Sequence, residues 1–112
     1  MFTLLFLISQ CKVYEDKMPS DQLLQNVADH VPKECWKPLF RSLMKSDRAD
    51  IEIEIIEMKN QNDLREMKYQ SLRKWKLSAP KEAATVGTLD RALRDVDCPS
   101  VAERISRFIE SK

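Results

Sequence analysis

Hydrophobic and polar residues alternate along this chain mostly with the period of an α-helix. The first apolar stripe consists of Leu23, Leu24 and Val27, and Ser20 stands where it can cap the first turn of that helix. Pro32 ends or redirects this helix, because the residue before a proline avoids the α region. The pattern therefore predicts a short amphipathic helix that opens after Ser20.

A second stripe follows directly, and its residues stand at i, i+3, i+4 and i+7. Pro38 falls inside this segment, and proline is tolerated in the first turn of a helix but not in its interior. We therefore expect a short turn from Lys33 and a helix that begins near Cys35 or Trp36. The stripe comprises Trp36, Leu39, Phe40 and Leu43.

The segment 51–57 (IEIEIIE) is ambiguous, since its strict alternation is typical of a strand. Two features favour a helix: Ser46 can cap it, and Ile51, Ile55 and Met58 stand at helical spacing. No partner strand is evident elsewhere. We interpret this segment as the third helix, with Ile55 in the core.

Three further helices complete the pattern, and the single glycine of the chain makes tight β-hairpins improbable. Asp63 and Thr85 can cap the fourth and fifth helices, and 98–100 (CPS) separates the fifth from the sixth. The predicted fold is all-α, a six-helix antiparallel bundle over residues 20–112. Its last three apolar faces comprise Leu64, Met67, Leu72 and Trp75; Val86, Leu89, Leu93 and Val96; and Val101, Ala102, Ile105, Phe108 and Ile109.

Residues 1–19 are expected to form an N-terminal extension. Its apolar part, 2–8 (FTLLFLI), is far shorter than the roughly 20 residues that span a bilayer. Two interpretations remain open: a remnant of a membrane or signal segment, or an extension that packs loosely on the domain.

Few residues have the chemistry of an active site. His30 is the only histidine, and the spacing of Cys11, Cys35 and Cys98 matches no zinc or disulfide framework. These cysteines are typical of free thiols in a reducing cytosol. No glycine-rich loop is present to bind a phosphate. We expect no enzymatic activity, no metal, no cofactor and no small-molecule substrate.

The charges are unevenly distributed although the net charge is only +1. An acidic segment, 46–58, lies between the basic segments 33–45 and 59–77. One interpretation is ordinary solvation with intramolecular ion pairs, each worth about 0–1 kcal/mol. The other is a surface with oppositely charged faces that docks onto similar domains, since such complementarity sets partner choice.

Four stretches resemble death domains of the tumour necrosis factor receptor superfamily, most nearly the type 1 receptor kind and more distantly the Fas-associated adaptor kind. They are VPKECWKPLFRSL, LREMKYQSLRKW, EAATVGTLDRALRDVD and VAERI, in the order found in that family. The resemblance runs from about Gln22 to Phe108. It does not extend to the cysteine-rich modules of such receptors, so cytokine binding is not implied.

The resemblance implies a cytoplasmic domain that signals towards apoptosis or NF-κB. Its partners would be adaptors with death domains, such as the TNF-receptor-associated death-domain protein, together with possible self-association. The implied core comprises Trp36, Leu39, Leu43, Ile55, Leu72, Trp75, Leu89, Leu93 and Ile105. The predicted docking residues are Lys37, Arg41, Asp50, Glu54, Glu57, Arg65, Lys68, Arg73 and Lys74.

Two rival functions belong to different classes. A nucleic-acid-binding domain would use the basic residues of the fourth helix and would bind random DNA with a steep salt dependence. The adjacent acidic segment and the near-zero net charge argue against it, so nucleic acid is not an expected partner. The other rival is a structural bundle that has no partner.

Overall fold

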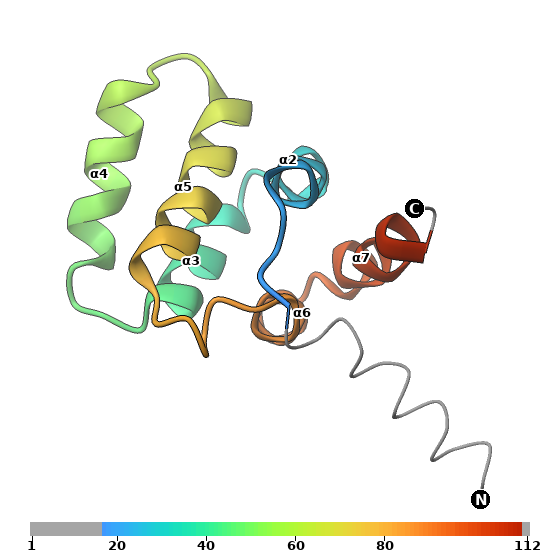
Figure 1. Cartoon of the computed structure of the whole chain (residues 1–112). Coiled ribbons are helices and arrows are strands. Elements are labelled where there is room, and N and C mark those ends of the chain that lie inside the picture. Colours follow the sequence, from blue (N-terminus) through green and yellow to red (C-terminus); the bar gives the residue numbers. More distant parts are fainter. Residues whose placement is uncertain (1–16, 111–112) are drawn as a thin grey trace, which may run out of the picture.

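The computed structural model describes residues 17–110, and within that range the chain forms six α-helices and no strand (Figure 1). The prediction of an all-α, six-helix fold is confirmed. With the labels of Figure 1, the helices are α2 (Asp21–His30), α3 (Trp36–Met44), α4 (Ala49–Lys59), α5 (Leu64–Ser78), α6 (Val86–Asp95) and α7 (Pro99–Glu110).

Side-chain caps begin three of the helices, as the sequence predicts. Ser20 accepts a hydrogen bond from the backbone of Leu23 at the start of α2. Asp63 accepts one from Glu66 at the start of α5. Thr85 caps α6 in the same way, through the N–H of Thr88. Each cap satisfies a backbone donor that has no partner inside its helix.

Pro38 is accommodated at the start of α3, as expected. Residues 33–35 form a turn and the helix begins at Trp36, so Pro38 is the third helical residue. A backbone N–H at that position has no partner within the helix, so a proline there removes no helical backbone hydrogen bond. The helix ends at Met44, and the next residue, Lys45, has a positive φ of 48° that does not continue the helix.

The core lies where α2, α3, α5, α6 and α7 converge. Helix α5 packs against α2, α3 and α4, while α7 packs against α2 and α6. Trp75 has no exposed surface and Phe40, Leu24 and Leu89 are equally enclosed. Of the implied core residues, the structure buries Trp36, Leu39, Leu43, Leu72, Trp75, Leu89, Leu93 and Ile105.

Ile55 is the exception, and its assignment to the core is wrong. Its side chain is 38% exposed, whereas Ile53 and Ile56 on the opposite face of α4 are buried. Helix α4 carries two apolar stripes, so spacing alone does not reveal which one points inward. Ala49 completes the inner stripe.

The predicted cap of α4 is also wrong. The helix begins at Ala49 after Arg48, and no side chain caps it. Ser46 instead accepts a hydrogen bond of 3.1 Å from the N–H of Arg48, two residues later. Serine side chains often make such local turns, and here the turn delays the start of the helix.

The chain immediately before α2 packs on the bundle. The carbonyl oxygen of Lys17 accepts a hydrogen bond of 2.8 Å from the N–H of Val86, and Pro19 is fully buried. These residues belong to the predicted extension 1–19, of which 1–16 lie outside the described residues. None of the helices in the described range is long and apolar enough to cross a membrane.

Candidate protein-docking surface

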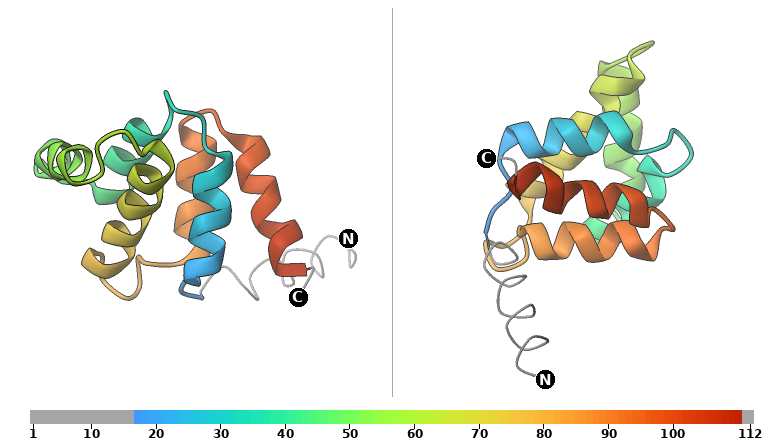
Figure 2. Two further views of the ribbon diagram at one scale, coloured as in Figure 1. Left: turned by 90° about the horizontal axis from the view of Figure 1, so that it is seen from above. Right: turned by 90° about the vertical axis from the view of Figure 1, so that its right-hand side faces the viewer.

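Helices α3, α4 and α5 place the three oppositely charged segments beside one another. Helix α4 lies at the outer edge of the molecule and packs against both α3 and α5 (Figures 1 and 2). The acidic helix is therefore flanked by the two basic ones in space as well as in sequence. This arrangement brings carboxylates and cations of the predicted docking set within reach of each other.

Two ion pairs join α3 to α4. Lys37 Nζ lies 2.9 Å from a carboxylate oxygen of Glu57. Arg41 Nε donates a hydrogen bond of 2.7 Å to Asp50 Oδ1. All four side chains are at least 39% exposed, so solvent screens both pairs.

A third pair joins α4 to α5, where Lys74 Nζ lies 3.6 Å from a carboxylate oxygen of Glu52. The Glu52 side chain is only 17% exposed. The sequence prediction did not include Glu52 among the docking residues. Its partner Lys74 is 45% exposed and remains accessible from outside.

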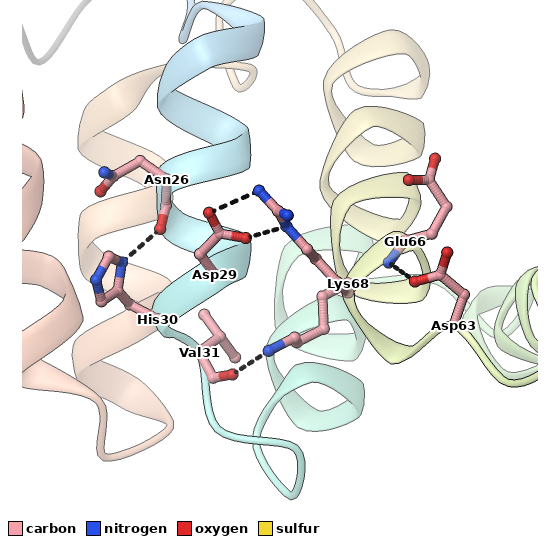
Figure 3. A network of polar contacts seen from close by, with 8 residues as sticks. Asn26, Asp29, His30, Val31, Asp63, Glu66 and Lys68 are labelled. Carbon is pink, nitrogen blue, oxygen red and sulfur yellow. Dashed lines mark hydrogen bonds and ion pairs between the residues drawn. The ribbon is translucent and has the colours of Figure 1, made fainter.

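Two cations of α5 bind residues of α2, and Figure 3 shows Lys68 beside Val31. Arg65 binds both carboxylate oxygens of Asp29, at 2.6 and 3.2 Å. Lys68 Nζ donates a hydrogen bond of 2.9 Å to the carbonyl oxygen of Val31, the residue at the C-terminal end of α2. A cation at that end satisfies a carbonyl without a helical partner and is favoured by the helix dipole.

Glu54 and Arg73 differ from the other predicted docking residues. Both are exposed, and neither forms an ion pair or a hydrogen bond with another side chain among residues 17–110. Glu54 lies on the outer side of α4, and Arg73 lies on α5 one turn before the exposed Leu77. Much of the charge alternation is thus intramolecular pairing, whereas Glu54 and Arg73 are not paired with an opposite charge within residues 17–110.

Sequence reasoning missed the apolar part of this surface. Within the described range, Ile51, Ile55 and Met58 are exposed on α4, and Leu77 is exposed on α5. The sequence does contain a sign of this exposed surface, because two sets of apolar residues at helical spacing occur in the one helix α4. Only one set can face the core, so the other must face outwards.

Of the residues considered for catalysis or metal binding, Cys11 lies outside the described residues, and His30, Cys35 and Cys98 form no catalytic or metal-binding group. His30 is exposed at the end of α2, with Nδ1 2.8 Å from the carbonyl oxygen of Asn26 (Figure 3). Burial and a hydrogen bond with Cys35 raise the pKa of the Cys98 thiol to about 11, and such a thiol is a poor nucleophile at neutral pH. Among residues 17–110 no group of histidine, cysteine, aspartate and glutamate side chains is arranged to hold a metal ion.

Comparison with known proteins agrees with this architecture. Residues 8–109 match the model of the death-domain family. Tumor necrosis factor receptor superfamily member 1A from Bos taurus is 40% identical over 86 residues, which cover 77% of this chain and 18% of the receptor. The same receptor from Rattus norvegicus is 35% identical over 89 residues, covering 80% of this chain and 19% of the receptor.

The chain thus spans less than a fifth of the length of these curated relatives. No solved structure matches it significantly. The family model covers nearly the whole chain, and the receptors are similar over more than three quarters of it. The chain therefore belongs to the death-domain family, whose members are non-enzymatic modules of homotypic protein–protein interaction.

Proposed function

We propose that this chain transmits a tumour necrosis factor receptor-type signal by docking onto the death domain of a cytoplasmic adaptor, with apoptosis or NF-κB activation as the outcome. The observation that carries the proposal is the match to the death-domain family over residues 8–109. The identity of 35–40% with type 1 receptors supports the choice of pathway. The adaptor we propose is the TNF-receptor-associated death-domain protein.

The proposed docking surface consists of the outward charges of α3, α4 and α5. Arg41, Asp50, Glu54, Arg65, Arg73 and Lys74 are the exposed members, and these helices lie side by side. Charges at such a surface mainly set the association rate and the choice of partner. Because exposed ion pairs contribute only about 0–1 kcal/mol each, a partner can replace the internal pairs at little cost.

Lys37, Glu57, Arg65 and Lys68 are proposed docking residues that, like Arg41, Asp50 and Lys74, also have internal partners. Lys37 and Glu57 bind each other, while Arg65 and Lys68 bind α2. Substituting any one of them changes both the surface and an internal contact. Single substitutions at these positions are therefore ambiguous tests of docking.

A charge swap avoids this ambiguity. The double variant Arg41→Asp/Asp50→Arg keeps an ion pair between α3 and α4 but reverses the polarity that a partner meets. We expect it to bind the adaptor death domain about tenfold more weakly than the parent, as measured by calorimetry or surface plasmon resonance. Circular dichroism and the melting temperature report whether the fold is retained.

The matched control is Asp90→Arg/Arg94→Asp. This i,i+4 pair lies on α6, away from α4, and its swap also conserves an ion pair. We expect the control to bind the adaptor like the parent. If neither swap alters binding, the surface assignment is wrong. If the folded parent chain itself shows no binding to the adaptor death domain, the proposed function is wrong.

A further inference from the structure

Helix α4 presents an apolar stripe to solvent. Ile51, Ile55 and Met58 are 54%, 38% and 71% exposed, and their spacing of four and three residues puts them on one face. The inner face of the same helix is already filled, since Ala49, Ile53 and Ile56 are buried. The fold therefore does not use the outer stripe.

The position of the stripe makes it accessible. Helix α4 forms one end of the molecule, with the other helices on its inner side (Figures 1 and 2). Single exposed hydrophobic residues are common on proteins, but adjacent ones that form a patch usually mark a binding surface. Three of the exposed large hydrophobic residues in the described range belong to this stripe.

Carboxylates border the stripe on the side that faces α3. Asp50 and Glu57 are paired with Arg41 and Lys37, whereas Glu54 has no cation beside it in residues 17–110. A complementary partner must therefore offer an apolar side chain next to a free cation. A second α4 does not meet this requirement, because stripe-to-stripe packing would bring carboxylates together.

The C-terminal half of α5 has the required features. Leu77 is 71% exposed, and Arg73 stands four residues earlier on the same face. Arg73 is exposed and has no carboxylate partner among the described residues. The neighbouring Lys74 points to the other side, towards Glu52 of α4, so the Arg73–Leu77 face is separate from the α4–α5 contact.

We propose that the outer stripe of α4 in one copy of this chain packs against the Arg73–Leu77 face of α5 in a second copy, with Glu54 opposite Arg73. The two surfaces differ, so the contact is heterologous and leaves one free surface at each end of a dimer. Further copies then add in the same direction. This inference rests on the proposed function, since it names a surface through which like domains associate.

The test uses two variants of the full chain. Ile51→Gln/Ile55→Gln removes the stripe, and Arg73→Glu/Leu77→Gln removes the α5 face. All four positions are exposed, so both variants should retain the parent's circular dichroism spectrum and melting temperature. Met18→Gln is the matched control, because Met18 is 49% exposed but precedes α2 and lies on neither surface.

Sedimentation velocity over a concentration series gives the result. We expect the parent and Met18→Gln to associate, and each double variant to show an apparent Kd raised at least about tenfold. A mixture of the two double variants should form a dimer with one copy of each, because one stripe and one α5 face are intact. Each double variant by itself lacks one of the two surfaces, so two copies of the same variant cannot form the contact.

Three results would overturn the inference: a monomeric parent at millimolar concentration, association unchanged in either double variant, or a mixture that stays monomeric. Unimpaired dimers of the Arg73→Glu/Leu77→Gln variant would indicate a stripe-to-stripe contact and also overturn it. Adaptor binding by the parent is measured in parallel. If the parent binds the adaptor but does not self-associate, this inference is wrong and the proposed function stands. If the parent self-associates but does not bind the adaptor, the proposed function is wrong.

Discussion

Arg41 on α3 and Asp50 on α4 are joined by a hydrogen bond of 2.7 Å although both side chains are more than half exposed. The pair crosses from a basic helix to the acidic one. Both interpretations of the charge pattern therefore apply to this pair: the two residues bind each other, and both belong to the proposed docking surface.

The first prediction concerns the strength of this pair. In a double-mutant cycle with Arg41→Ala and Asp50→Ala, we expect a coupling free energy of about 0–1 kcal/mol, because water screens both charges. Urea denaturation of the parent, both single variants and the double variant measures it. A coupling of several kcal/mol would show that the pair holds α4 in place and is not available to a partner.

The second prediction tests which face of α4 is buried. Ile53→Ala should lower the free energy of unfolding by roughly 2–5 kcal/mol, since Ile53 is 3% exposed and its loss leaves a cavity. Ile55→Ala should lower it by much less than Ile53→Ala does, because Ile55 is 38% exposed and buries less apolar surface. The two substitutions are chemically identical and lie on one helix, so each controls the other. Similar losses in both variants would contradict the orientation of α4.

The third prediction concerns Trp75, which has no exposed surface at the centre of the core. Trp75→Ala should cost roughly 3–5 kcal/mol, a large part of the usual stability of a small domain. The indole N–H has no hydrogen-bond partner among the described residues, and a buried donor without a partner is costly. Trp75→Phe removes that donor and keeps an aromatic ring.

We therefore expect Trp75→Phe to lose less than half as much stability as Trp75→Ala. Thermal and denaturant unfolding of both variants measure the difference. A melting temperature unchanged in Trp75→Ala would refute the role of this residue as a core anchor.

The fourth prediction follows from Cys98, whose pKa is raised from 9.0 to about 11, first by burial and then by its hydrogen bond with Cys35. Folding favours the neutral thiol, so this contribution to stability is complete below pH 9. It is lost as the pH rises towards 11, because the unfolded chain then releases a proton that the folded chain retains.

The measurement compares the parent with Cys98→Ala in denaturant titrations between pH 8 and pH 11. The parent should lose more stability than the variant over this interval, because the variant lacks the Cys98 thiol. Thiol alkylation at pH 8 offers an independent check, since Cys98 should react only as fast as the domain opens. Parallel pH profiles for the two proteins would contradict the raised pKa.

The sequence by itself determined the helices, most of their boundaries and the family. The caps at Ser20, Asp63 and Thr85 are local interactions, so residues a few positions apart suffice to predict them. Helices with a single apolar stripe, such as α6 with Leu89 and Leu93, also allowed only one orientation. Where one face is apolar and the other polar, burial follows from the pattern alone.

Only the tertiary structure decided the orientation of α4 and which of the surface charges form ion pairs within the domain. Both faces of α4 are apolar, so packing against α3 and α5 selected Ile53 and exposed Ile55. The same packing set Asp50 beside Arg41 and left Glu54 and Arg73 without partners in the described part of the chain. These outcomes depend on contacts between residues distant in sequence, and the spacing of residues within a single helix carries no information about such contacts.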